Sequence, residues 1–358
     1  MSDGIERRTF IRRAAQVAGA AAAATGLASC RQEAQETAAQ PVEPKPIAQS
    51  GTITTRVLGK TGVEVPILGF GGATLATKWG NALSTEDRVR LVRHAYDSGI
   101  RYYDTAISYT YEDSQAIIGE ALKDVRDNVF ITTKVDFWDL SKPDGRFTTV
   151  PKGEAARQVD MNLAELQSEY IDAIMIHGTP GVEQMTVKQC MEVHAELVKA
   201  RDEGLARYVG FSAHHYFDKA LELTATGGFD LCMLAYGYLP RGNSRLFSPL
   251  TTELRNACLA KAHELGMGIV AMKVIGAGML SGFGEKEFEG LPGAAIRWAM
   301  QDDRVQVMAI GMRSPAEVDA NIATLTGDTA YTNEDRALLA KAGAAVLNHE
   351  DVRKMSVE

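Results

Sequence analysis

Short apolar runs alternate along the chain with longer segments in which apolar residues recur at helical spacing. The expected strands are the runs 65–71, 101–106, 129–135, 171–177, 207–212, 229–236, 268–274 and 305–311. The expected helices are 84–98, 112–123, 152–166, 187–203, 217–226, 252–265, 292–301 and 315–325. Several of these helices are followed by glycine, which is common where a helix ends in a left-handed cap. The pattern therefore predicts eight strands that alternate with eight helices.

This alternation favours an α/β fold, a closed (β/α)8 TIM barrel over residues 51–358, with an N-terminal β-hairpin and an extra C-terminal helix. The alternative is an open doubly wound sheet, which normally has a glycine-rich loop of G-x-G-x-x-G spacing directly after its first strand. The segment Gly69-Phe70-Gly71-Gly72 lacks that spacing. We therefore predict the barrel.

The first 30 residues have the layout of a cleavable export signal: a charged start, a short Ala-rich run and small residues at its end. The run is too short and too weakly apolar to span a membrane. Arg7-Arg8-Thr-Phe-Ile-Arg resembles a twin-arginine signal, and Leu27-Ala-Ser-Cys30 resembles the lipobox of bacterial lipoproteins. The alternatives are a surface helix for the run, and ordinary signal-peptidase cleavage near Cys30.

Residues 31–50 are polar and interrupted by proline, so they are expected to form a disordered tether. Together the two segments predict an exported protein of the periplasm or cell envelope. The export machinery would recognise Arg7 and Arg8, and a lipid on Cys30 would hold the domain at a membrane. Because twin-arginine export moves folded proteins, a bound cofactor would be able to travel with the domain.

The charge and the cysteines exclude several classes of protein. The formal net charge is −8 and no basic stripe is present, which argues against nucleic-acid binding. Three cysteines, Cys190, Cys232 and Cys258, lie in apolar patterns and are expected to be buried thiols rather than a disulfide framework or a metal site. Adjacent His214 and His215 diverge and lack a third ligand at zinc spacing, so we expect no metal.

Titratable residues follow the ends of three consecutive expected strands. Asp104 lies at the end of the second, with Tyr109 five residues later, and Lys134 and His177 lie at the ends of the third and fourth. In a barrel of this type the carboxyl ends of the strands form the active site. Each residue alone has a structural alternative: a helix cap, a packed loop tyrosine, a solvated strand end or a structural histidine. The occurrence of all four residues at or near three consecutive strand ends favours a catalytic role over these structural alternatives.

These residue types suit the reduction of a carbonyl group by hydride addition. A tyrosine hydroxyl, with its pKa of about 10, donates its proton readily only where the phenolate is stabilised. A lysine ammonium beside it favours the phenolate, and an aspartate holds that lysine in place. A neutral imidazole can hydrogen-bond a carbonyl oxygen and orient the substrate. We predict Tyr109 as general acid in reduction and general base in alcohol oxidation.

The chain combines several motifs of one protein family. Two of them are Tyr103-Asp-Thr-Ala-Ile-Ser-Tyr109 and Gly204-Leu-Ala-Arg-Tyr-Val-Gly-Phe-Ser212, and others lie in 58–72, 118–122, 163–177 and 312–321. Over about residues 54–325 the chain resembles the aldo-keto reductase family. The resemblance implies that Asp104, Tyr109, Lys134 and His177 are its catalytic tetrad. It also implies a nicotinamide dinucleotide across the barrel mouth, usually NADP, with Ser212 contacting the carboxamide.

Three positions depart from the family pattern. Ala213 stands where asparagine is common, Met233 where glutamine is common, and Met272 where an aromatic ring usually stacks under the nicotinamide. A methionine sulfur can pack on a ring, so Met272 stays a candidate contact. The polar contacts to the carboxamide are expected to be fewer.

The cofactor phosphates require further donors. Lys273, Gly276 and Gly278 follow the seventh strand, where bare backbone can approach a pyrophosphate, although such a loop can also be a flexible turn. Arg313 and Ser314 precede a helix, whose N-terminus attracts anions. The resemblance adds Glu317 and Asn321 near the adenine. Arg313 facing a 2′-phosphate favours NADP, with NAD as the alternative.

Loop aromatic residues suggest the substrate-binding surface. These are Trp79, Phe137, Trp138 and Tyr238, which suit an apolar or sugar-like carbonyl compound, with core packing as the alternative for each. The predicted activity is an NAD(P)H-dependent oxidoreductase acting on an aldehyde or ketone, or on the corresponding alcohol. Two other classes stay open: a cofactor-binding regulatory or redox-sensing subunit with little turnover, and a solute-binding lipoprotein.

Overall fold

The computed structural model describes residues 46–47, 51, 53–137, 150–243, 245–276 and 288–357. The predicted signal with Arg7, Arg8 and Cys30 lies outside the described residues, as does all of the tether except 46–47. In the part of the chain that is described, no helix is long and apolar enough to cross a membrane.

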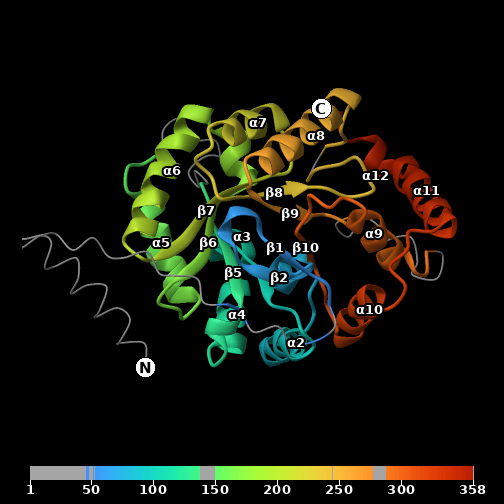
Figure 1. The fold of residues 1–358 in the computed structure, drawn as a ribbon, viewed down its shortest axis with the longest axis horizontal. Coiled ribbons are helices and arrows are strands. Elements are labelled where there is room, and N and C mark those ends of the chain that lie inside the picture. Colours follow the sequence, from blue (N-terminus) through green and yellow to red (C-terminus); the bar gives the residue numbers. More distant parts are fainter. Residues whose placement is uncertain are drawn as a thin grey trace, which may run out of the picture.

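Eight parallel strands close into a barrel in the order β10-β3-β4-β5-β6-β7-β8-β9, with helices around the outside (Figure 1). The strands are β3 (Leu68–Gly71), β4 (Tyr102–Asp104), β5 (Phe130–Val135), β6 (Ile171–Ile176), β7 (Ala206–Ala213), β8 (Leu231–Ala235), β9 (Gly268–Met272) and β10 (Val307–Ile310). The predicted (β/α)8 TIM barrel is confirmed. In this fold the loops at the carboxyl ends of the strands are where chemistry is expected.

Helices follow the strands, and most of them form the outer layer of the barrel (Figure 1). They are α2 (Thr85–Asp97), α3 (Ser108–Tyr111), α4 (Ser114–Leu122), α5 (Glu154–Glu165), α6 (Val187–Asp202), α7 (Phe217–Ala225), α8 (Pro249–Glu264), α9 (Leu291–Met300), α10 (Pro315–Thr326), α11 (Asn333–Asn348) and α12 (Glu350–Arg353). Ser84, Thr186, Ser248, Ser314 and Thr332 cap the N-termini of α2, α6, α8, α10 and α11 through their hydroxyl oxygens. α11 packs against α9 as the extra C-terminal layer.

One predicted helix begins later than expected. The pattern indicated a helix over 112–123, whereas the structure has the short helix α3, a break at Glu112 with φ of 51°, and then α4. A positive φ is uncommon for a residue other than glycine, so the apolar pattern gave no sign of this break. Both tyrosines of this segment, Tyr109 and Tyr111, lie in α3, before the break.

A two-stranded antiparallel hairpin closes the amino-terminal end of the barrel. It consists of β1 (Thr55–Val57) and β2 (Glu64–Pro66). The turn between them lies against the start of β9, where Lys60 N donates to Gly266 O. Gly59 has φ of 51°, and a Cβ there would lie 2.3 Å from Gly268 N, so glycine is required. Only the carboxyl-terminal end is left for a ligand.

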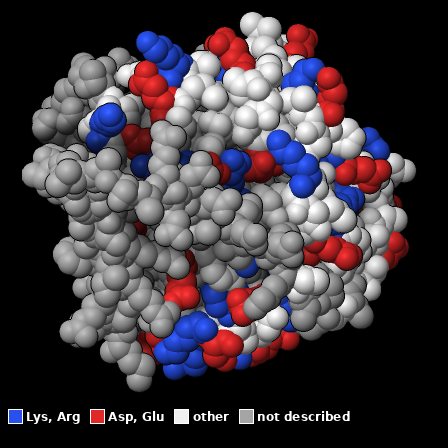
Figure 2. Space-filling view, turned by 60° about the vertical axis from the view of Figure 1, so that its left-hand side comes forward, with Lys and Arg blue, Asp and Glu red and all other residues white. Residues whose placement is uncertain are grey.

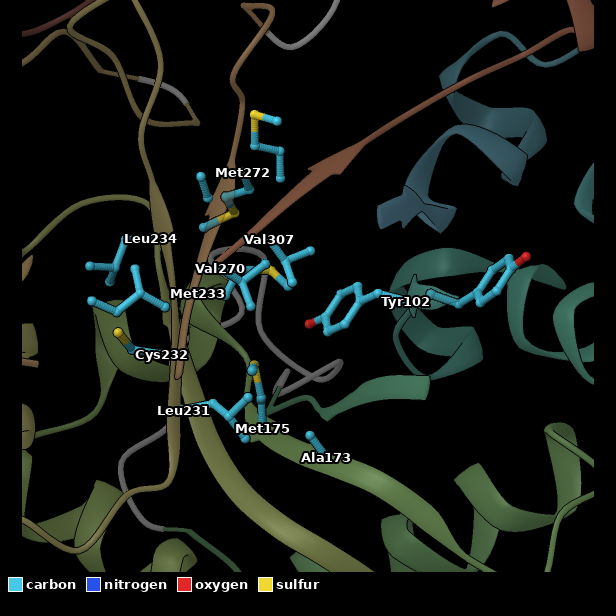
Figure 3. Packing of buried hydrophobic residues seen from close by; sticks show 14 of the residues in the cluster. Tyr102, Ala173, Met175, Leu231, Cys232, Met233, Leu234, Val270, Met272 and Val307 are labelled. Atoms are coloured by element: carbon cyan, nitrogen blue, oxygen red, sulfur yellow. The ribbon is translucent and has the colours of Figure 1, made fainter. Parts of the chain in front are cut away.

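The barrel interior is filled by side chains rather than hollow. Met175, Met233, Val270 and Val307 converge with the ring of Tyr102 (Figure 3), and each is at most 1% exposed. Thr132 Oγ1 donates to the Tyr102 hydroxyl oxygen at 2.8 Å, which satisfies that buried polar group. The packed interior makes a floor beneath the groups at the strand ends.

A buried ion cluster lies at the amino-terminal end of β6. Both oxygens of Asp172 are paired, one with Arg126 at 2.8 Å and the other with Arg207 at 2.9 Å, and the Asp172 side chain is 1% exposed. The N–H of Ile131 also donates to Asp172 at 2.9 Å. Because this cluster lies at the end closed by the hairpin, its charges tie strands together structurally.

The predicted cysteine chemistry agrees with the structure. Cys190, Cys232 and Cys258 are free and buried. Burial raises the pKa of the Cys190 thiol to about 12 and that of Cys258 to about 11, so both stay protonated. On the face drawn in Figure 2, acidic and basic side chains of the described part are interspersed. No cluster that could hold a metal ion occurs among the described residues.

Candidate active site

Three of the four predicted catalytic residues meet at the carboxyl ends of β4, β5 and β6. Lys134 Nζ forms an ion pair and hydrogen bond with Asp104 and donates to Thr105 O at 2.6 Å. Lys134 is 1% exposed, Asp104 5% and His177 3%. Burial raises the pKa of the Asp104 carboxyl, and the attraction of the Lys134 ammonium opposes that rise. The cluster is buried and charged at the mouth of the barrel.

Tyr109 does not join this cluster, contrary to the prediction. Its side chain is 43% exposed, and its hydroxyl lies 3.4 Å from the Met161 sulfur and accepts from Arg157 Nη2 at 3.0 Å. The tyrosine that lies among the predicted residues is Tyr111. Its ring centroid is 5.2 Å from Lys134 Nζ and 5.8 Å from the His177 ring, which it meets edge-on.

The short helix α3 decides which tyrosine faces the site. At its start, the N–H and hydroxyl of Ser108 donate to the carboxylate of Glu165, at 3.1 and 2.5 Å. At its end, the Glu112 carboxylate accepts from the N–H and hydroxyl of Thr77, at 2.7 and 2.8 Å. Residues 109 and 111 are about 200° apart around a helix, so only one of them can face the barrel. The two anchors place Tyr111 there.

The environment of Tyr111 favours its protonated form. Burial raises the pKa of the Tyr111 hydroxyl well above its ordinary value, and the carboxylates of Asp104 and Asp136 add to that rise. The expected stabilisation of a phenolate by lysine is weakened, because the Lys134 ammonium is paired with Asp104 and lies over the tyrosine ring. At neutral pH, Tyr111 therefore carries the proton that a general acid needs.

His177 has an acidic partner that the sequence analysis did not anticipate. Its Nδ1 lies 3.1 Å from Oδ2 of Asp136, with side-chain exposures of 3% and 0%. The main chain of Asp136 is held on both sides by Gln158 of α5, which accepts from Asp136 N and donates to Asp136 O, each at 2.6 Å. The other carboxylate oxygen, Oδ1, accepts from Phe137 N at 3.2 Å. The position of the imidazole is thus fixed by a buried carboxylate.

The predicted nicotinamide contacts lie along the same rim. Ser212 is fully buried, and its hydroxyl oxygen accepts from Gly178 N at 2.8 Å. Met272, at the end of β9, is 9% exposed. The next residue, Lys273, has φ of 64°, and burial together with nearby Arg241 lowers its pKa to about 8. No ion pair to Lys273 is present in the described part of the chain.

Arg313, Ser314 and Glu317 lie together at the N-terminus of α10, and Asn321 lies further along the same helix. Ser314 caps this helix, and Glu317 accepts from Arg313 N at 2.8 Å. The guanidinium of Arg313 donates to Trp79 O at 2.8 Å, and Asn321 is 5% exposed. Gly276, with φ of 86°, is described, whereas Gly278 lies outside the described residues. A basic side chain thus lies beside a capped helix N-terminus, which suits a phosphate.

One of the predicted substrate aromatics, Trp79, contacts Tyr111. It is 42% exposed and meets Tyr111 edge-on at 5.2 Å between centroids. Phe137 is fully buried in the core, and Trp138 lies outside the described residues. Burial raises the pKa of the Tyr238 hydroxyl to about 12. His214, 6.3 Å from His177 between ring centroids, adds a further polar group, and burial lowers its pKa well below the ordinary value.

Comparison with known proteins decides the family. The model of the Aldo/keto reductase family matches residues 67–294, more than half of the chain. The chain belongs to this family. The match contains the strand ends that carry Asp104, Lys134 and His177. These three residues therefore lie within the part of the chain that matches the family.

Three similar proteins show the range of names, of sequence identity and of the share of each chain that is covered. Probable aldo-keto reductase 1 of Glycine max is 28% identical over 64% of this chain and 62% of its own length. L-galactose dehydrogenase of Arabidopsis thaliana is 24% identical over 76% and 88% respectively. The holo form of aldo-keto reductase AKR11C1 from Bacillus halodurans superposes with a TM-score of 0.63 at 22% identity, covering 84% of this chain and 99% of that one. This last likeness concerns the fold.

Sequence reasoning missed Tyr111 and Asp136. Tyr109 was predicted from its place five residues after Asp104 and from the family resemblance of the motif 103–109, whereas Tyr111, two residues later, matched no motif. Asp136 lies two residues beyond Lys134, so along an extended chain it points to the same side. That spacing was an available signal.

Proposed function

We propose that this aldo-keto reductase transfers hydride reversibly between NAD(P)H and an aldehyde or ketone, with Tyr111 rather than Tyr109 as the proton donor. The observation that carries the proposal is the position of Tyr111 beside both His177 and Lys134. Family membership supports the reaction class. The Tyr111 hydroxyl is protonated at neutral pH, and because its raised pKa makes it a weaker acid than a free tyrosine, the proposal rests on its position and not on that shift.

The residues of the cluster have separate tasks in this proposal. Tyr111 donates a hydrogen bond to the substrate oxygen and gives up its proton as that oxygen becomes an alkoxide. The Lys134–Asp104 ion pair lies beside the ring of Tyr111, and a second hydrogen bond, from Lys134 Nζ to Thr105 O, helps to hold the ammonium in place. His177 contacts the same oxygen from the other side. Trp79 covers part of the mouth and excludes water from one side of Tyr111.

The residues on the rim fit a nicotinamide dinucleotide. The reduced nicotinamide supplies the hydride when it is bound. Lys273 is a half-buried cation suited to a diphosphate, and Arg313 with the capped N-terminus of α10 suits a second phosphate. This second site favours NADP over NAD. Ser212 and Met272 are the candidates for the nicotinamide itself, and Asn321 and Glu317 for the adenine.

Substrate turnover with each cofactor tests this proposal. The mature chain would be assayed with NADPH and with NADH against 4-nitrobenzaldehyde, glyceraldehyde and a quinone, and against the corresponding alcohols with oxidised cofactor. We expect turnover with a lower KM for NADPH than for NADH. Tight binding of NADPH without turnover of any compound would instead support a regulatory subunit. Absence of both binding and turnover would refute the oxidoreductase assignment.

The names of the relatives bear on the substrate class. One relative is named for a sugar, L-galactose, and another, from Microbacterium luteolum, is named pyridoxal 4-dehydrogenase. Both names denote oxidation of a hydroxyl-bearing compound. We therefore include polyhydroxylated alcohols in the panel. The assay compares the turnover of these polyhydroxylated alcohols with the turnover of apolar alcohols.

We also propose that the protein is exported with its cofactor bound and is then held by a lipid at Cys30. The support is the sequence pattern of residues 1–50. Changing Arg7 and Arg8 to Lys is expected to leave the protein inside the cell. Cys30→Ala is expected to release the mature domain from the membrane, which cell fractionation measures; retention after a salt wash would exclude the lipid anchor. Protein purified from the envelope is expected to release about one dinucleotide per chain on denaturation.

A further inference from the structure

A second histidine, His214, lies beside the catalytic cluster without a hydrogen bond from its ring. It directly follows β7, and its ring centroid is 6.3 Å from that of His177. The residue is 8% exposed, its Nδ1 is buried, and neither ring nitrogen has a hydrogen-bond partner in the part of the chain that is described. A buried polar group without a partner is rare in a folded protein and calls for an explanation. A ligand that brings its own polar group to the ring supplies one.

Packing rather than hydrogen bonding fixes the position of His214. Gly178, just beyond the end of β6, lies so close that a Cβ on this residue would be 3.2 Å from His214 Cδ2. Gly242, in the loop after β8, lies against the main chain, where a Cβ would be 2.0 Å from His214 O. The neighbouring His215 ring is used within this loop, because its Nε2 accepts from Asn243 N at 3.0 Å. His214 is therefore held in place while its ring nitrogens stay unused.

The surroundings of His214 keep its ring neutral. Burial lowers the pKa of the ring well below its ordinary value, and the charge of Lys273 adds to that lowering. At neutral pH the ring then has one N–H group and one lone pair, so it can donate one hydrogen bond and accept another. A hydroxyl group has the same two capacities, whereas a methylene group has neither. The ring is therefore suited to a hydroxyl group of a bound molecule.

We propose that His214 is a specificity-determining residue that hydrogen-bonds a hydroxyl group on the carbon next to the substrate carbonyl, so that 2-hydroxy aldehydes and 2-hydroxy ketones are preferred over their unsubstituted analogues. The inference rests on the proposed function, and it names the substrate class of that same site. There the carbonyl oxygen lies against Tyr111 and His177. An imidazole nitrogen reaches about 2.9 Å to an oxygen. Two rings 6.3 Å apart can therefore bind two oxygens that are carried by adjacent carbon atoms.

The size of the preference follows from what the unsubstituted compound leaves unpaired. A 2-hydroxy aldehyde gives the His214 ring a hydrogen bond. The aldehyde without the hydroxyl group excludes water from the ring and supplies no partner, so a polar group stays buried and unpaired. We expect the hydroxylated compound to be favoured by about 10–100-fold in kcat/KM, the combined effect of one hydrogen bond gained and one unpaired group avoided.

Lactaldehyde and propanal are the matched pair of substrates, because they differ only in the hydroxyl group next to the carbonyl. The mature chain would be assayed with NADPH, and kcat and KM would be determined for each compound. Equal values of kcat/KM for the two would overturn the inference and leave the reductase assignment intact. Absence of turnover with both, and with the wider panel of compounds above, would refute the proposed function itself.

Variants at His214 assign the preference to this side chain. His214→Leu removes both nitrogens and fits within the space of the ring, and it should bring the lactaldehyde-to-propanal ratio of kcat/KM to about 1, mainly through a higher KM for lactaldehyde. His214→Gln again donates and accepts, so it should restore part of the ratio. His194→Leu is the matched control: this half-buried histidine of α6 bonds to Gly228 O at 3.0 Å, and its loss should leave the ratio unchanged.

Binding of NADPH, followed by fluorescence, separates a substrate contact from a cofactor contact. In His214→Leu the dissociation constant of NADPH should stay within about 2-fold of the wild-type value, because the proposed contact is with the substrate. A rise of about 10-fold or more with an unchanged lactaldehyde-to-propanal ratio would assign His214 to the cofactor and overturn the inference. An unchanged ratio with unchanged NADPH binding would overturn it as well.

Discussion

Removing the hydroxyl of Tyr111 is the sharpest test of the catalytic assignment. Tyr111→Phe keeps the ring that meets His177 and Trp79 edge-on and removes only the oxygen. The protein should fold normally, because the substitution leaves no cavity larger than one atom. Tyr109→Phe makes the same chemical change two residues away, so the pair of variants separates the two assignments.

The expected magnitudes differ strongly between the two tyrosines. Loss of a general acid lowers kcat by about 10²–10⁴, which corresponds to roughly 3–5 kcal/mol of barrier. In Tyr111→Phe no hydroxyl is left at this position to donate a proton to the substrate oxygen. At Tyr109, 43% exposed, the loss is a hydrogen bond from Arg157, which still pairs with Glu154. We expect activity within about 2-fold and less than about 1 kcal/mol in stability there.

The assay is steady-state reduction of 4-nitrobenzaldehyde followed by NADPH absorbance, with NADPH binding measured separately by fluorescence. In Tyr111→Phe, kcat should fall while the dissociation constant of NADPH stays within about 2-fold, since no cofactor contact is removed. A large loss in Tyr109→Phe with near-normal turnover in Tyr111→Phe would refute the geometry described here. Equal losses in both would show that neither residue acts alone.

Three further changes test the fold and its charges. Asp172→Asn leaves its two partly buried arginine partners without their full counter-charge and should cost about 3–5 kcal/mol in urea unfolding. Folding lowers the pKa of Lys273 from 10.5 to about 8. Between pH 8 and pH 10.5 the unfolded chain therefore binds more protons at this residue than the folded chain does. The free energy of unfolding of the wild type, relative to that of Lys273→Met, should rise with pH across this window by on the order of 3 kcal/mol. Gly119→Ala would place a Cβ 2.4 Å from Leu166 O and should destabilise by about 1–3 kcal/mol, and an unchanged urea midpoint would contradict the packing of α4 on the end of α5.

The alternation of strand and helix was readable along the chain because it depends on local periodicity. Each strand is a short apolar run, fully buried between the packed interior and the helical layer, as for β5 and β6. Hydroxyl caps such as Ser84 and Thr186 are local signals as well, since the cap and its N–H partner are three residues apart. Asp104, Lys134 and His177 were predictable for the same reason: they lie at strand ends, and a closed barrel brings those ends together.

The choice between Tyr109 and Tyr111 could not be made this way. Both residues are tyrosines and both follow β4, so neither the residue type nor the place after the strand separates them. The rotation of α3 about its axis decides which of them faces the barrel. That rotation is set by Glu165 of α5 and by Thr77, which lie 57 and 35 residues from their partners Ser108 and Glu112. Contacts at such separation leave no periodic trace in the sequence.

The sequence alone determined the kind of protein: its barrel, its family and three of the residues at its centre, because these follow from periodicity and from motifs within single segments. The tertiary structure decided which tyrosine reaches the site and which carboxylate supports His177. Asp136 and His177 are 41 residues apart and directly follow the neighbouring strands β5 and β6, whose register brings them within 3.1 Å. Proton transfer depends on such distances, and only the assembled barrel sets them.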